Sequence, residues 1–171
     1  MIIKINKSII SKNSKTYFIA DIGANHDGKL KRAKKLIKLA ASAGANAAKF
    51  QHFKADTIVN KFQFDKTKKS AHQSKWKSSV YEVYKKASID NNWNQSLKKE
   101  CKKYNIDFLT SPYDLNYIDD VNKYIPAFKI GSGDITWIES LVKIAKKKKP
   151  VILATGASSF EDVIRATKTI L

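Results

Sequence analysis

Short apolar segments alternate with amphipathic segments along most of the chain. Five apolar runs lack a clean alternation with polar residues, which is typical of strands buried on both faces of a parallel sheet. These runs are residues 17–21, 46–50, 106–110, 127–130 and 151–155. A helical pattern follows each run, so the sequence predicts repeated βα units.

The helical segments share a spacing of three and four residues between apolar positions. The first predicted helix begins after Asp27-Gly28 and ends near Ala43-Gly44, where glycine favours a C-cap; its apolar face consists of Leu30, Ala33, Ile37 and Ala40. The same spacing predicts further helices that start near Trp93, Ile138 and Phe160.

The close spacing of the later strands, which begin at residues 106, 127 and 151, favours a (β/α)8 TIM barrel over an open sheet. Residues 17–171 hold only about the first five βα units, and the helical pattern runs to the end without a stop signal, so we expect a truncated barrel. Residues 1–16 are expected to contain a short hairpin that covers the bottom of the barrel.

A long polar segment with many lysines and scattered aromatic residues separates the second predicted strand from the third. A long βα loop at the catalytic face of a barrel is usually a lid or a wall of the substrate site. A solvated excursion explains the same composition, and the sequence leaves both explanations open.

Composition limits the function classes. The net charge is +18, from 33 basic and 15 acidic residues, but only Arg32 and Arg165 are arginines and the lysines are spread over helix faces. That distribution is typical of solvated helices, so we expect no nucleic-acid partner. No apolar segment is long enough for a membrane span or a signal peptide, which predicts a cytoplasmic protein without a membrane partner. The single cysteine, Cys101, is expected to face the core.

Polar residues cluster where the predicted strands end. Lysines at positions 49 and 129 lie within strands, and a buried ammonium group costs free energy unless it is paired. Hydroxyl groups and glycine turns accompany them, so the set suits a ligand with a phosphate and a carboxylate. For each lysine alone, a snorkelling side chain or a pair with Asp21 or Asp134 is the simpler alternative.

Five motifs in order resemble the N-terminal barrel of the sialic acid synthases, the family that includes N-acetylneuraminate, legionaminate and pseudaminate synthases. They are FIADIGANHDG, GANAAKFQ, FLTSPYD, FKIGSGD and VILATGASS. The resemblance runs from about residue 2 to Leu171. It implies a TIM barrel of the phosphoenolpyruvate-condensing aldolase type, followed by a small antifreeze-like domain.

The resemblance also implies an activity. Family members condense phosphoenolpyruvate with an open-chain N-acylated amino sugar, such as N-acetylmannosamine, and release phosphate and a nine-carbon 2-keto sugar acid. They act as homodimers and use a divalent metal, typically manganese, which polarises the sugar aldehyde. The family's metal-binding histidines lie on later strands, so the ligands are expected beyond Leu171. The three histidines present, His26, His52 and His72, show no metal-ligand spacing.

Carried over by motif, Asp21, Lys49 and Lys129 are the implied catalytic residues. The implied substrate-binding residues are Asn25, His26, Ser111, Ser132 and Thr155. For His26, a structural hydrogen bond to nearby loop backbone is an equally good explanation. Asp21 stands where the family usually has glutamate. Ala154 stands where relatives often have a phosphate-binding serine, for which Thr155 or a backbone amide is expected to compensate.

Two other functions stay open on the sequence. One is a different phosphoenolpyruvate-condensing barrel that uses a phosphorylated aldose, which needs an additional basic cluster for the sugar phosphate. The other is a non-catalytic fragment or a basic nucleic-acid-binding protein.

Overall fold

The computed structural model describes residues 2–66, 73 and 75–171. A five-stranded parallel sheet runs through it in the order β3-β4-β5-β6-β7. The strands are β3 (Ile19–Gly23), β4 (Ala47–His52), β5 (Asp107–Pro112), β6 (Phe128–Ile130) and β7 (Val151–Leu153). Neighbours in the sheet are neighbours in the chain, as in five consecutive units of a (β/α)8 barrel, so the predicted strands and fold class are confirmed.

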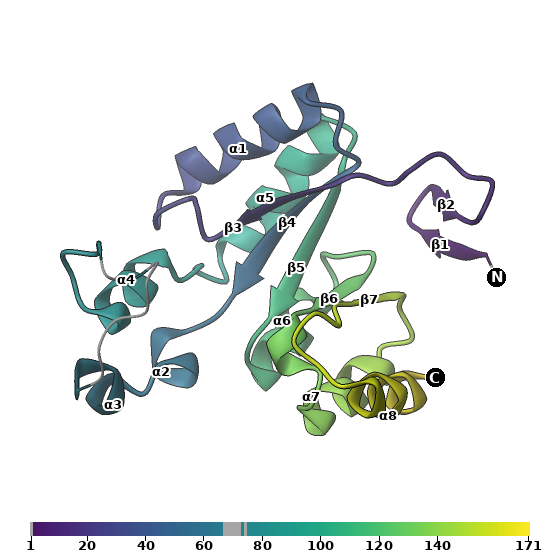
Figure 1. Cartoon of the computed structure of the whole chain (residues 1–171). Coiled ribbons are helices and arrows are strands. Elements are labelled where there is room, and N and C mark those ends of the chain that lie inside the picture. Colours follow the sequence, from purple (N-terminus) through teal and green to yellow (C-terminus); the bar gives the residue numbers. More distant parts are fainter. Residues whose placement is uncertain (1, 67–72, 74) are drawn as a thin grey trace.

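A helix follows each strand and packs on the outer face of the sheet (Figure 1). These helices are α1 (Leu30–Ser42), α5 (Trp93–Lys103), α6 (Leu115–Asn122), α7 (Ile138–Ala145) and α8 (Phe160–Ile170). In α1 the predicted apolar face is buried at Ala33, Ile37 and Ala40. Ala43 is the C-cap residue, and Gly44 follows it at φ +86°, a conformation that favours glycine, so the predicted end of the helix at Ala43-Gly44 is confirmed.

Side chains alternate between the two faces of each strand. In β4, Ala48 and Phe50 face the helices and belong to the main hydrophobic core, which also holds Cys101 as expected. Ala47 lies in a second cluster on the inner face of the sheet, with Leu109 and Ala127. Residues of the inner face that come later in each strand therefore lie near the carboxyl ends of the strands, where a barrel carries its site.

The expected hairpin is present, with β1 (Ile3–Ile5) and β2 (Ser8–Ile10) paired antiparallel. Ile5 is buried in the same inner cluster as Ala47, so the hairpin covers the amino ends of the barrel strands. In Figure 1 it lies at the opposite end of the strands from the segment that joins β4 to α5.

That joining segment is more regular than the sequence suggested. Its described part contains α2 (Ala55–Ile58), α3 (Lys61–Lys66) and α4 (Val80–Ala87), whereas the sequence predicts one long loop. A serine cap starts α4, because the Ser79 side chain accepts a hydrogen bond from the Glu82 amide. Among the described residues, no helix is long and apolar enough to cross a membrane.

Candidate functional site

Inner-face side chains at the carboxyl ends of four strands form the centre of the site. Asp21 of β3 pairs in register with Lys49 of β4, and Gln51 of β4 with Ser111 of β5. Lys129 of β6 lies on the same inner face, beyond Ala127. The sheet thus brings together residues that are more than a hundred positions apart in the chain.

The first cavity, which we call the lysine cavity, has a volume of about 390 Å3. Its lining includes five predicted site residues, Asp21, Lys49, Ser111, Lys129 and Ser132, and adds Gln51, Tyr113, Gly131, Gly133, Asp134 and Ala154. Ser132 begins a short 3-10 helix (Ser132–Asp134) directly after β6. Gly131 leaves room for the site side chains at this turn, because a Cβ there would lie 2.8 Å from a carboxylate oxygen of Asp134 and 3.2 Å from the Tyr113 hydroxyl.

Lys49 is buried and paired. Its Nζ lies 2.9 Å from Asp21 Oδ1, and the lysine side chain is 8% exposed whereas the aspartate side chain is 63% exposed. The simpler alternative considered for this lysine, a pair with Asp21, is therefore what the structure shows. Because an ammonium group has three donor hydrogens, the pair still leaves donors for a ligand in the cavity.

Lys129 and Asp134 lie on the other side of the lysine cavity. Burial lowers the pKa of Lys129 below its ordinary value, and the nearby Lys49 ammonium lowers it further. Its Nζ donates a hydrogen bond of 2.7 Å to the backbone oxygen of Ile130. Burial raises the pKa of Asp134, and Lys129 offsets part of that effect. The repulsion between these two ammonium groups, which line the same cavity, makes the space between them favourable for an anion.

Gln51 and Tyr113 are site residues that the sequence reasoning did not single out. The Gln51 amide donates to the Tyr113 hydroxyl at 3.4 Å. Burial raises the pKa of Tyr113, so its phenol keeps its proton and can donate to a ligand. Gln51 could have been found from the strand period, because it lies two residues after Lys49 and shares its face.

A second cavity of about 550 Å3, which we call the aromatic cavity, adjoins the first and shares Asp21 and Gln51 with it. Its other lining residues are Gly23, Ala24, Asn25, Asp27, Phe53, Trp76, Val83, Tyr84 and Ala87. The Tyr84 ring lies 5.4 Å from the Phe53 ring and 6.5 Å from the Trp76 ring, measured between centroids. The described part of the joining segment therefore forms a wall of this cavity. Of the two explanations that the sequence left open, a part of the substrate site and a solvated excursion, the structure supports the first.

Three predicted site residues, Asn25, Thr155 and His26, do not line the lysine cavity. Asn25 lines the aromatic cavity, and its side-chain amide donates to the backbone oxygen of Ile22 at 2.9 Å. Thr155 is exposed and does not line the lysine cavity, where Ala154 takes that position. Thr155 follows the end of β7, and the structure does not bring it together with the other residues of the set.

His26 lies behind the site. It is 0% exposed and packs against the rings of Trp93 and Phe50. Its Nδ1 accepts a hydrogen bond of 3.1 Å from the Gly28 amide, and burial lowers its pKa. The structure thus supports the explanation in which this histidine serves the loop backbone, and it does not bring His26 to either cavity.

Nothing in the described part of the chain fits a divalent metal. It holds no group of three or more histidine, cysteine, aspartate or glutamate residues placed to bind one. His52 is buried, with Nδ1 2.7 Å from Thr110 Oγ1 and Nε2 2.7 Å from Asn94 Oδ1. His72 lies outside the described residues. Metal ligands beyond Leu171 stay a prediction.

Comparisons with known proteins show the family of this chain. The NeuB family model matches residues 36–171. An uncharacterized protein of Methanocaldococcus jannaschii is 37% identical over 98% of this chain and 46% of its own length. The N,N'-diacetyllegionaminic acid synthase of Campylobacter jejuni is 39% identical over 91% of this chain and 47% of its own length.

The fold comparison gives the same family. The crystal structure of N-acetylneuraminic acid synthetase from Leptospira borgpetersenii superposes with a TM-score of 0.85 at 26% identity, over 99% of this chain and 55% of that one. The chain spans about half the length of the curated relatives it matches. With a family model that covers most of its residues, this chain belongs to the NeuB family.

Proposed function

We propose that this chain carries the phosphoenolpyruvate-binding part of a sialic (nonulosonic) acid synthase, which joins phosphoenolpyruvate to an N-acylated amino sugar. One observation supports it above the others: the lysine cavity and the aromatic cavity meet at Asp21 and Gln51. A condensation of two substrates needs two adjoining sites whose ligands touch at the shared wall.

The lysine cavity suits phosphoenolpyruvate. Lys49 and Lys129 supply positive charge for its phosphate and carboxylate, and the hydroxyl groups of Ser111, Ser132 and Tyr113 line the same space. Charge-assisted hydrogen bonds from ammonium groups to phosphate are among the stronger polar contacts, and burial strengthens them. In this proposal the two lysines hold the ligand and offset the charge of the departing phosphate.

The proposed reaction forms one carbon–carbon bond. C3 of phosphoenolpyruvate attacks the carbonyl carbon of the open-chain sugar, and the carbonyl oxygen takes up a proton. Water adds at C2, and the resulting tetrahedral intermediate expels phosphate to leave a 2-keto acid. Asp21 lies between the cavities, 2.9 Å from Lys49 Nζ, a position from which a carboxylate can orient water or a sugar hydroxyl. A divalent metal bound by residues outside this chain would polarise the sugar carbonyl.

The aromatic cavity favours an unphosphorylated sugar. Among the described residues, its lining holds the carboxylates of Asp21 and Asp27 and no lysine or arginine, so a sugar phosphate would meet repulsion there. Phe53, Trp76 and Tyr84 offer apolar ring surface that suits an acyl methyl group. The rival that uses a phosphorylated aldose is therefore less favoured.

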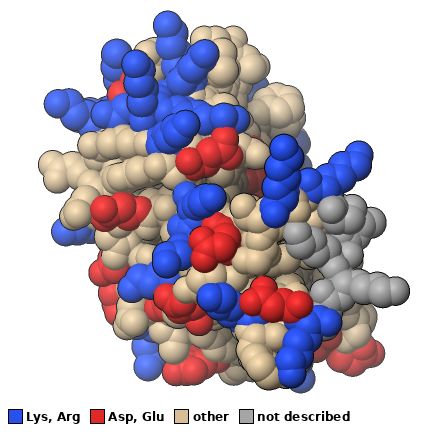
Figure 2. Space-filling model, turned by 90° about the vertical axis from the view of Figure 1, so that its left-hand side faces the viewer, with Lys and Arg blue, Asp and Glu red and all other residues tan. Residues whose placement is uncertain are grey.

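The distribution of charge also argues against a nucleic-acid-binding protein. In Figure 2, basic side chains gather at the top of the view, where α1 lies in Figure 1, and acidic and basic side chains are mixed over the rest of that face. In α1 the basic residues belong to an amphipathic helix whose apolar face is buried, which is typical of a solvated helix.

The test uses the protein expressed from its complete reading frame. With manganese, phosphoenolpyruvate and N-acetylmannosamine or a diacetylated diamino sugar, we expect phosphate release that Lys129→Met reduces at least about a hundredfold. Lys31→Met, which changes an exposed lysine of α1, should release phosphate at the rate of the unmodified protein. Three results would contradict the proposal. They are phosphate release without a sugar, phosphate release only with a phosphorylated aldose, and full activity of the Lys129→Met variant.

A further inference from the structure

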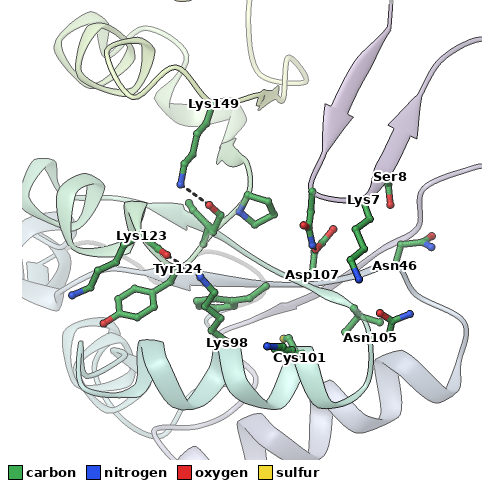
Figure 3. A pocket seen from close by; sticks show the side chains of 16 residues that line it. Lys7, Ser8, Asn46, Lys98, Cys101, Asn105, Asp107, Lys123, Tyr124 and Lys149 are labelled. Carbon is green, nitrogen blue, oxygen red and sulfur yellow. Dashed lines mark hydrogen bonds between the residues drawn. The ribbon is translucent and has the colours of Figure 1, made fainter.

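A third cavity lies at the opposite end of the barrel, among the amino ends of the strands. This basal cavity has a volume of about 580 Å3 and lies between the tip of the β1-β2 hairpin, the end of α5 and the segments that lead into β5 and β6 (Figure 3). It shares no lining residue with the lysine cavity or the aromatic cavity. The function proposed above does not use it.

Positive charge dominates its lining. The lining lysines are Lys7, Lys98, Lys102, Lys123 and Lys149. The one carboxylate in the described lining, Asp107, is already engaged, because its oxygens accept hydrogen bonds from Asn6 Nδ2 at 2.8 Å and from the Tyr17 hydroxyl at 2.7 Å. The basal cavity therefore has a surplus of ammonium groups that no carboxylate of its own offsets.

Two of these lysines have a structural partner. Lys98 Nζ donates to the backbone oxygen of Lys123 at 2.9 Å, and Lys149 Nζ donates to the backbone oxygen of Ile125 at 2.8 Å and also to that of Asn122. Both thereby satisfy carbonyl groups at and after the end of α6. Burial lowers the pKa of Lys149, and Lys98 lowers it further, so the two charges repel each other.

The other lysines of the lining include two, Lys7 and Lys102, that do not bind the carbonyl groups at the end of α6. Neither Lys7 nor Lys102 makes a side-chain hydrogen bond or ion pair with any residue that the structure describes. The hydrogen bond between Asn6 and Asp107 fixes the hairpin tip, and this places Lys7 over the basal cavity from the side opposite Lys149 (Figure 3). Ammonium groups from three separate elements therefore surround one space.

The floor of the basal cavity is apolar. Cys101, Ile106, Phe108 and Ile125 are buried there, and the Tyr124 ring lies beside them. The ammonium groups of Lys98 and Lys123 lie 5.9 and 5.0 Å from the centroid of that ring. A simple inorganic anion would use the lysines alone, whereas a ligand that also carries an aromatic ring can pack against the Tyr124 ring and the apolar residues of the lining.

We propose that the basal cavity binds a nucleotide, with its phosphates among the lysines and its base on the apolar floor beside Tyr124. A volume of about 580 Å3 lies within the range of small-molecule sites, roughly 300–1,000 Å3. The bound nucleotide bridges the hairpin and the barrel, because Lys7 comes from the hairpin and Lys102 from α5. Binding therefore raises the melting temperature of the protein as well as occupying the cavity.

The test measures ADP binding by calorimetry and by thermal shift. We expect saturable binding that weakens as salt increases, with adenosine and pyrophosphate each binding more weakly than ADP. The double variant Lys7→Gln/Lys102→Gln should lose about tenfold in affinity for each lysine removed. It should fold normally, since neither side chain has a partner among the described residues. The matched control Lys12→Gln/Lys15→Gln removes two exposed lysines between the hairpin and β3 and should bind ADP as the unmodified protein does.

Several results would overturn the proposal. They are the absence of saturable ADP binding at millimolar concentration, equal affinity in the Lys7→Gln/Lys102→Gln variant, and pyrophosphate binding as tight as that of ADP. Competition separates this cavity from the lysine cavity. If phosphoenolpyruvate displaces ADP, or if a Lys49→Met variant no longer binds ADP, then ADP occupies the lysine cavity instead.

Discussion

The buried imidazole of His52 predicts a strong dependence of stability on pH. Its Nε2 lies 2.7 Å from Asn94 Oδ1, and its Nδ1 lies 2.7 Å from Thr110 Oγ1. An amide oxygen only accepts hydrogen bonds, so the ring proton belongs on Nε2, and Nδ1 accepts from the threonine hydroxyl. The ring thus links β4, β5 and α5 in its neutral form.

The magnitude follows from the pKa. Burial lowers the pKa of His52 from 6.5 to about 4, with the Asn94 hydrogen bond acting against burial and His26 acting with it. Between these two values the unfolded chain binds a proton at this residue and the folded chain does not, so stability falls as the pH falls. A difference of one pKa unit corresponds to about 1.4 kcal/mol. The free energy of unfolding therefore falls by about 3 kcal/mol between pH 7 and pH 4 through this residue.

Urea unfolding followed by tryptophan fluorescence at pH 7, 6, 5 and 4 measures this loss. The control is His52→Gln, which keeps polar atoms near both partners and removes the titrating group. Carboxylates lower the stability of both proteins at acid pH, so the difference between the two curves isolates His52. Parallel curves, or a His52 resonance that titrates near 6.5 in the folded protein, would refute the reasoning.

Two further predictions concern the first βα loop and the lysine cavity. A Cβ at Gly28, where φ is +67°, would lie 2.2 Å from a backbone oxygen of α4, so Gly28→Ala should lower the free energy of unfolding by at least about 2 kcal/mol. Gly44→Ala, at φ +86° with open space around it, should cost only about 1 kcal/mol, and equal costs would contradict the steric argument. Lys49→Met should leave the free energy of unfolding within about 1 kcal/mol, because an apolar side chain of similar length fills the buried position and the Asp21 carboxylate that loses its partner is 63% exposed and stays hydrated. It should weaken phosphoenolpyruvate binding at least about tenfold by calorimetry, and unchanged affinity would remove Lys49 from the site.

The regular part of the fold could be predicted because local pattern and tertiary packing agree there. The strand around Phe50 and the helix around Ile37 bury the residues that their periodicity marks. The segment between β4 and α5 gave a weaker signal. Its helix α2 has four residues and α3 buries none of its side chains, so neither carries the apolar face from which a helix is recognised.

The site was predictable where a residue type conflicts with its position. Lys49 and Lys129 stand out as charged residues inside apolar strands, and both line the lysine cavity. Tyr113 and Gln51 gave no such conflict, because an amide or a phenol near a strand end is common in any fold. The position of Thr155 in its motif predicts a site residue, but Ala154 lines the cavity and Thr155 does not. Such choices depend on side-chain direction at a strand end, which periodicity does not determine once the strand stops.

The ion pair between Lys49 and Asp21 predicts coupling between the two substrates. The pair is asymmetric, since the lysine side chain is 8% exposed and the aspartate side chain 63% exposed. An anion bound to the remaining donors of Lys49 shares its positive charge with Asp21 and weakens the ion pair, and the Asp21 carboxylate lies at the wall shared with the aromatic cavity, where the proposed sugar binds. Phosphoenolpyruvate should therefore raise the affinity for the amino sugar, and the sugar should raise the affinity for phosphoenolpyruvate by the same factor. Calorimetric titration of each ligand with and without the other measures both factors, and Asp21→Asn should bring them close to one. Equal sugar affinity with and without phosphoenolpyruvate, or coupling that survives Asp21→Asn, would show that the carboxylate does not link the two cavities.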